Sequence, residues 1–73
     1  MAVQIVMDHS GDTRHHFDAT NKKALSDAER RFNALTGAGF TGAVRQPNGD
    51  VSLMRSFDPT AEETVFFPRL VGG

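Results

Sequence analysis

A single stretch of helical periodicity limits the fold of this chain more than any other feature. Four apolar residues recur there at the spacing of one face of an amphipathic helix: Leu25, Ala28, Phe32 and Leu35. The spacing predicts a helix over residues 22–36. With one helix available, helical packing can cover only one face of a sheet.

The two ends of the predicted helix carry different signals. Gly37 is a typical carboxyl-terminal stop. Ser26 and Glu29 form a capping-box pattern that would start the helix at that point. A start near Thr20 or Asn21 is equally open.

Segments with the alternation or composition of strands flank the helix on both sides. We predict two strands before the helix and three after it: residues 2–8, 13–19, 40–46, 51–57 and 64–68. The order is β-β-α-β-β-β, an α+β domain with one helix packed on one face of a mixed sheet. We expect the first and last strands to lie side by side and parallel in the middle of that sheet.

Turn residues separate the predicted strands. Gly11 is free to adopt a positive φ between the first two strands. Asn48 and Gly49 form a strong hairpin signal between the third and fourth. Pro59 is predicted to open a single helical turn before the last strand.

Composition excludes several classes of function. A chain of 73 residues forms one small domain with little room for a deep catalytic pocket, so we expect no enzymatic activity of its own. A net charge of -1 gives no general attraction to nucleic acid or membranes, so neither is an expected partner. Cysteine is absent, which removes disulfides, thiolate metal sites and a cysteine nucleophile. Because no signal-peptide pattern or membrane-spanning run is present, we expect a cytoplasmic protein.

The sheet face without a helical cover is a candidate binding surface. If Phe66 faces the helix, Val65 and Phe67 lie on the uncovered face. Val6 and Met54 are predicted to extend this apolar patch. An uncovered apolar patch often marks a partner surface. Two alternatives stay open: the strand register or a bulge hides one of these residues, or they are scattered, exposed apolar groups without a function.

The first hairpin is rich in imidazole and carboxylate groups, which suit a divalent metal. However, His15 and His16 are adjacent in a strand, so their side chains diverge. We therefore predict a solvated surface and no metal site, although these groups are the ones to consider: Asp8, His9, Asp12, His15, His16 and Asp18.

The carboxyl-terminal stretch EETVFFPRLVGG joins an acidic segment, an apolar strand, a proline and two final glycines. Together with the order of the elements, it resembles the ubiquitin-like β-grasp family. The tail is most similar to the MoaD-type and ThiS-type sulfur carriers of molybdopterin and thiamine synthesis, and to ubiquitin-like modifiers. The segment TGAVRQPNGDVSLMRSFDP departs from the carrier pattern, which leaves the pathway open.

This resemblance implies a protein carrier or modifier whose Gly73 carboxylate is adenylated for sulfur transfer or conjugation. A ThiF-like adenylating enzyme would use ATP and pass the carrier to an acceptor protein. The chain itself would bind no cofactor, and we expect a monomer when it is free. Residues 1–67 would form the domain, and residues 68–73 would form a flexible tail.

The residues of the tail have separate implied roles. Gly72 and Gly73 would pass through a narrow channel of the enzyme, where a Cβ would clash. The residues before them would give reach and grip through main-chain hydrogen bonds and side-chain pockets: Pro68, Arg69, Leu70 and Val71.

Two alternatives stay open beside the carrier. The first is a non-covalent β-grasp adaptor or assembly module, of phage or mobile-element origin, that acts through its exposed sheet face. The second is that the two glycines are only a frayed chain end.

Overall fold

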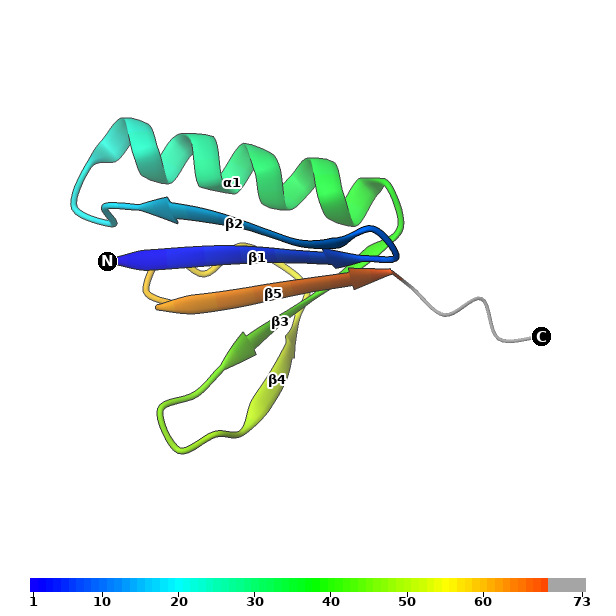
Figure 1. The fold of residues 1–73 in the computed structure, drawn as a ribbon. Helices are drawn as coiled ribbons and strands as arrows, with labels where there is room; N and C mark the ends of the chain where they lie inside the picture. Colours follow the sequence, from blue (N-terminus) through cyan, green and yellow to red (C-terminus); the bar gives the residue numbers. More distant parts are fainter. Residues whose placement is uncertain (69–73) are drawn as a thin grey trace.

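A computed structural model describes residues 1–68 and shows one helix packed on a five-stranded mixed sheet (Figure 1). In chain order the elements are β1 (Ala2–Asp8), β2 (Gly11–Phe17), α1 (Lys22–Gly37), β3 (Phe40–Arg45), β4 (Val51–Met54) and β5 (Glu63–Pro68). The predicted α+β class and the predicted order of elements are confirmed.

The strands lie in the order β2-β1-β5-β3-β4. β1 and β5 pair in parallel, from Val3 opposite Glu63 to Val6 opposite Phe66. The other neighbouring strands pair antiparallel. β5 is therefore the middle strand, and α1 connects the β1–β2 half to the β3–β4 half. The expected parallel pairing of the first and last strands is confirmed.

The earlier of the two predicted helix starts is correct. Asn21 is the N-cap of α1, and its side-chain Oδ1 accepts a hydrogen bond from the N–H of Ala24 at 3.0 Å. Such a cap is worth about 1 kcal/mol. Ser26 lies inside the helix, so the capping-box interpretation is wrong. At the other end, Gly39 adopts a φ of 102°, which favours glycine and turns the chain into β3.

Phe32 of α1 is the centre of the core. Its ring packs edge-on against Phe66 of β5, with centroids 5.6 Å apart, and against Phe57 of the segment between β4 and β5 at 6.1 Å. Edge-on aromatic pairs add about 0.5–1.5 kcal/mol each beyond the burial of their area. These contacts determine that Phe66 faces the helix.

Gln4 of β1 is fully buried beneath the same helix. Its Nε2 donates to the carbonyl oxygen of Ala28 at 3.0 Å, and its Oε1 accepts from Nη1 of Arg31 at 2.7 Å. A buried amide is costly unless its polar atoms are paired, and here the donor and acceptor both have partners. Gln4 therefore turns one face of β1 toward α1.

Four local predictions differ from the structure. β2 begins at Gly11 and ends at Phe17, two residues earlier at each end than the predicted strand of residues 13–19. β4 ends at Met54, three residues before the predicted end at residue 57. Pro59 opens no helical turn, because Oδ1 of Asp58 accepts both the N–H and the hydroxyl of Thr60, at 2.9 and 2.6 Å, and this local turn competes with a helix. Pro68 is the last residue of β5, opposite Phe40, as the predicted strand of residues 64–68 has it, so it does not belong to the predicted tail of residues 68–73. A proline is tolerated at this position because it is at the end of the strand.

The close packing around Phe32 gives a first prediction. A Cβ added at Gly42 would lie 3.0 Å from Cε2 of Phe32 and 3.5 Å from Cε1 of Phe66. Gly42→Ala should therefore lower the free energy of unfolding by about 1–3 kcal/mol through overpacking, measured by urea denaturation.

Gly37→Ala is the matched control. Apart from its chain neighbours and the backbone of its own helix, no atom lies within 4 Å of a Cβ at Gly37, which is the last residue of α1. This change should raise stability by up to about 1 kcal/mol, because alanine favours the helix. Equal effects of the two substitutions would contradict the packing described for Phe32.

Candidate functional site

The sheet face opposite α1 has no other element packed on it in the part of the chain that the structure describes (Figure 1). We call it the open face. Its members follow from side-chain alternation along each strand and from the strand register. The members without an ionisable side chain are Val3, Ile5, Met7, Thr41, Ala43, Val51, Leu53, Val65 and Phe67, and Asp12, Arg14, His16, Arg45 and Glu63 lie on the same side.

A continuous apolar row crosses the middle of the open face. Ile5 lies opposite Val65, Val65 opposite Ala43, and Ala43 opposite Leu53. The row therefore spans four strands, from β1 to β4. Ile5 and Ala43 are only 7% and 1% exposed, so neighbouring side chains already cover them.

The exposed apolar side chains of the described chain gather on this face. Leu53 is 73% exposed, Val51 59%, Met7 41% and Phe67 37%. Within residues 1–68, Met1 is the one other large hydrophobic residue with this degree of exposure. Because four such residues share one face, scattered exposure does not explain them, and the open face is the candidate functional site.

Charged groups of both signs border the open face. Asp12, Arg14 and His16 of β2 lie opposite its β1 residues. At one end, Nε of Arg45 lies 2.6 Å from Oε2 of Glu63, and both side chains keep substantial exposure to solvent. An exposed pair of this kind adds little stability. It does leave that end of the face without a net charge.

Two predicted members of the face lie elsewhere. Val6 is in register with Phe66, and Met54 is in register with Gly42, which packs against Phe32. Both therefore belong to the helix side of the sheet, and their predicted place on the uncovered face is wrong. Val65 and Phe67 do lie on the open face.

The predicted uncovered face did not include five apolar residues of the open face, although the sequence contained a signal for them: Val3, Ile5, Met7, Val51 and Leu53. The alternation of Val3, Ile5 and Met7 groups them correctly, but it does not say on which side of the sheet they lie. The burial of Gln4 decides that side and brings the apolar set outward. In the same way, Val51 and Leu53 share a face by simple alternation across the hairpin.

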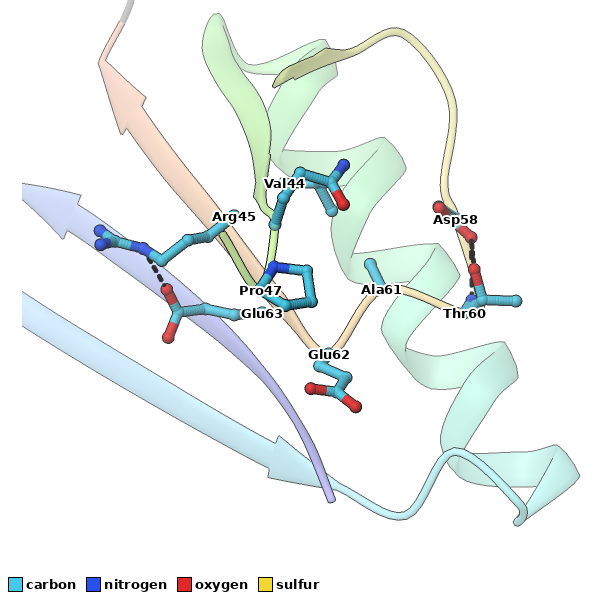
Figure 2. A pocket seen from close by; sticks show the side chains of 9 residues that line it. Val44, Arg45, Pro47, Asp58, Thr60, Ala61, Glu62 and Glu63 are labelled. Atoms are coloured by element: carbon cyan, nitrogen blue, oxygen red, sulfur yellow. Dashed lines mark hydrogen bonds and ion pairs between the residues drawn. The ribbon is translucent and has the colours of Figure 1, made fainter. Parts of the chain in front are cut away.

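A separate hollow of about 510 Å³ lies where β3 ends and the segment before β5 begins (Figure 2). Its charged groups already have partners within the chain: Arg45 with Glu63, and Asp58 with Thr60. These interactions leave Glu62 as the exposed carboxylate of the hollow. The hollow thus offers no convergent set of polar groups for a ligand.

A polar cluster lies beneath the helix beside Gln4. His15 of β2 is opposite Gln4 in the β1–β2 register. Partial burial, and then the positive charge of Arg31, lower the pKa of His15 below its usual value of 6.5. Arg31 is held near by its hydrogen bond to Gln4.

Three aspartates close local turns with a serine or threonine two residues later. Hydrogen bonds from the hydroxyl and the N–H of Ser10, Thr20 and Thr60 lower the pKa of Asp8, Asp18 and Asp58 respectively. Across residues 1–68, no three His, Asp or Glu side chains gather closely enough to hold a metal ion. These groups therefore have structural partners in the turns.

Several predicted site residues lie outside the described chain. They are the tail residues Arg69, Leu70, Val71, Gly72 and Gly73.

Among the described residues, the helix α1 is not long and apolar enough to cross a membrane.

Comparisons of the chain with protein-family models, with curated proteins and with solved structures find no match. Function must therefore be inferred from the residues and their arrangement.

The cluster around His15 gives a second prediction. Because its pKa is lowered on folding, the unfolded chain binds the proton more readily. The contribution of neutral His15 to stability is complete above about pH 6.5 and is lost as the pH falls through the folded-state pKa. His15→Gln should therefore lose less stability than the parent between pH 7.5 and 5 in urea denaturation.

His16→Gln is the matched control, because it removes an imidazole from the exposed side of the same strand. The turn aspartates titrate below pH 3.8 and do not contribute in this range. An identical pH dependence for His15→Gln and the parent would contradict the role of Arg31 and burial at this position.

Proposed function

We propose that this chain is a ubiquitin-like β-grasp carrier or modifier whose Gly73 carboxylate is activated by a partner enzyme. The observation that carries the proposal is the strand order β2-β1-β5-β3-β4 with a parallel central pair and one connecting helix. This arrangement is compatible with a β-grasp, and the carboxyl-terminal sequence resembles the tails of its carriers.

The proposal gives the open face and the tail complementary tasks. The open face would bind the activating enzyme through its apolar row and its exposed apolar side chains. β5 is the middle strand, and it carries both Val65 and Phe67 on this face. Residues 69–73 follow β5 directly in sequence, so an enzyme bound around Phe67 would be close to where the tail begins.

The chemistry requires a free carboxylate at Gly73. Attack of that carboxylate on the α-phosphorus of ATP would give an acyl adenylate and pyrophosphate. A sulfur nucleophile or an amine would then displace AMP, forming a thiocarboxylate or an amide. This chain has no cysteine, so any thiol must come from a partner. Its side-chain amines are those of Lys22 and Lys23, both exposed at the start of α1.

The test is activation by a ThiF-like adenylating enzyme from the same genome. With ATP, the full chain should support exchange of labelled pyrophosphate into ATP, because the carboxylate is the acceptor of AMP. A chain lacking Gly72 and Gly73 should lose this exchange by at least about tenfold, equivalent to about 1.4 kcal/mol.

Intact-mass measurement provides the second readout for the same reaction. With a sulfur donor present, the full chain should gain the mass difference between sulfur and oxygen. Exchange that is unchanged in the truncated chain, or no exchange with the full chain, would contradict the carrier proposal.

A second candidate function is a non-covalent adaptor that acts through the open face alone. The exposure of Leu53 and Val51 favours it, because both residues lie on β4, two strands away from β5, from whose end the tail continues. In this case partner binding would not need the two glycines.

The substitution Phe67→Asp tests the open face in both candidates. Placing a carboxylate at this partly exposed apolar position should weaken partner binding by roughly tenfold or more, measured by calorimetry, because a charge would be desolvated in the interface. Asn33→Asp on the exposed side of α1 is the matched control for added charge.

The two candidates differ in the effect of the tail. An adaptor should retain partner affinity when Gly72 and Gly73 are deleted, whereas a carrier should lose activation. Partner binding that survives Phe67→Asp but fails in Asn33→Asp would place recognition on the helix and contradict both.

A further inference from the structure

The two edges of the sheet differ sharply in chemistry. β2 forms one edge, and charged or imidazole side chains project from it: Asp12, Arg14, His15 and His16. Charged residues on an edge strand protect it against pairing with another strand. β4 forms the opposite edge, and its four residues, Val51 to Met54, carry no charge.

The main chain of β4 offers hydrogen-bonding groups at this unprotected edge. The N–H of Gln46 donates to the carbonyl of Asp50 at 2.7 Å, so these two residues form a hydrogen-bonded pair. This pair determines which residues of β4 direct their main-chain groups toward β3. In an antiparallel pair, every second residue turns its N–H and C=O away from the neighbouring strand. On β4 these residues are Val51 and Leu53, whose side chains are also 59% and 73% exposed.

We propose that the β4 edge is an interface between two copies of this chain, which pair antiparallel through β4. In the pairing register, Ser52 lies opposite Ser52 of the second copy. Val51 then lies opposite Leu53 of that copy, and Leu53 lies opposite its Val51. Each of these two pairs exchanges two main-chain hydrogen bonds. In this register the main-chain N–H and C=O groups of Val51 and Leu53 that point away from β3 all have hydrogen-bond partners. The hydrogen bonds between β3 and β4 do not change.

Charge complementarity favours a second copy in this orientation. Asp50 precedes β4 and Arg55 follows it. In this register Asp50 of one copy lies opposite Met54 of the other, one residue from Arg55, at both ends of the interface. Parallel pairing would bring like charges together, so the sequence around β4 is self-complementary only when the strands run in opposite directions.

The twofold axis of such a pair is perpendicular to the sheet. Both copies of α1 then lie on the same side, and the two open faces join on the other side. The apolar row from Ile5 to Leu53 continues into Val51 of the second copy. The pairing goes beyond the proposed carrier function, replaces the expected free monomer, and does not depend on activation of Gly73.

A single cysteine tests the register directly. Ser52 would form a non-hydrogen-bonded pair across the axis, with Cα atoms about 4.5 Å apart. Disulfides span Cα distances of roughly 4.4–6.8 Å. Because the chain has no cysteine of its own, Ser52→Cys should form a covalent dimer rapidly under mild oxidation with copper phenanthroline. Thr13→Cys, exposed on the β2 edge, is the matched control and should cross-link at least tenfold more slowly.

Sedimentation of the cysteine-free chain over a concentration series provides an independent measurement. The parent should show a reversible monomer–dimer equilibrium. Leu53→Pro should shift it to monomer, because proline removes an outward N–H that the β3–β4 ladder does not use. Phe67→Lys, which changes the open face but not the edge, should leave the equilibrium in place.

Three outcomes would overturn the proposal. The parent could sediment as a monomer at every concentration, or Thr13→Cys could cross-link as fast as Ser52→Cys. Alternatively, Phe67→Lys could abolish the dimer while Leu53→Pro preserves it, which would indicate association through the open face. None of these outcomes affects pyrophosphate exchange, so a failure here is distinguishable from a failure of the carrier proposal.

Discussion

The burial of Gln4 beneath α1 determines which side of each strand faces the helix and which side forms the open face. Its side chain links β1 to the carbonyl of Ala28 and to Arg31, so the even-numbered residues of β1 face the helix. The parallel pairing of β1 with β5 brings Phe66 to the same side, where Phe32 packs against it. The apolar residues Val3, Ile5 and Met7 are consequently on the open face, opposite α1. A polar contact in the core thus creates an apolar surface outside it.

That surface connects the fold to the proposed function. A chain with one helix can protect one face of its sheet, and an unprotected apolar face is a liability unless another molecule covers it. Here the face includes the middle strand, which continues directly into the carboxyl-terminal segment. Recognition by a partner and delivery of Gly73 to that partner would therefore use neighbouring parts of the chain. The uncharged β4 edge offers a second surface, directed at another copy.

Local sequence patterns predicted the elements of the fold well, because helix spacing and turn residues act over short distances. The helix over residues 22–36 and the hairpin at Asn48-Gly49 are examples. The assignment of faces was less successful, since it depends on contacts between distant residues. The predicted place of Val6 on the uncovered face would put Gln4 there as well by alternation, yet Gln4 is buried beneath the helix by partners 24 and 27 residues away. Val6 and Met54 were misplaced for the same reason. Pro59 does not start a helix because the N–H of Thr60 donates to Oδ1 of Asp58 in a local turn, which a proline pattern alone does not reveal.

The most direct test of the open face as the recognition surface is solvent paramagnetic relaxation of methyl groups by NMR. It would be measured on the free chain and again with a ThiF-like adenylating enzyme bound. The methyls of Met7, Val51, Leu53 and Val65 should be relaxed in the free chain, in proportion to their exposure, and protected in the complex. Those of the buried Ala28 should be protected in both. Protection that appears instead on the outer side of α1, such as at Ala34, would contradict the central role of the open face.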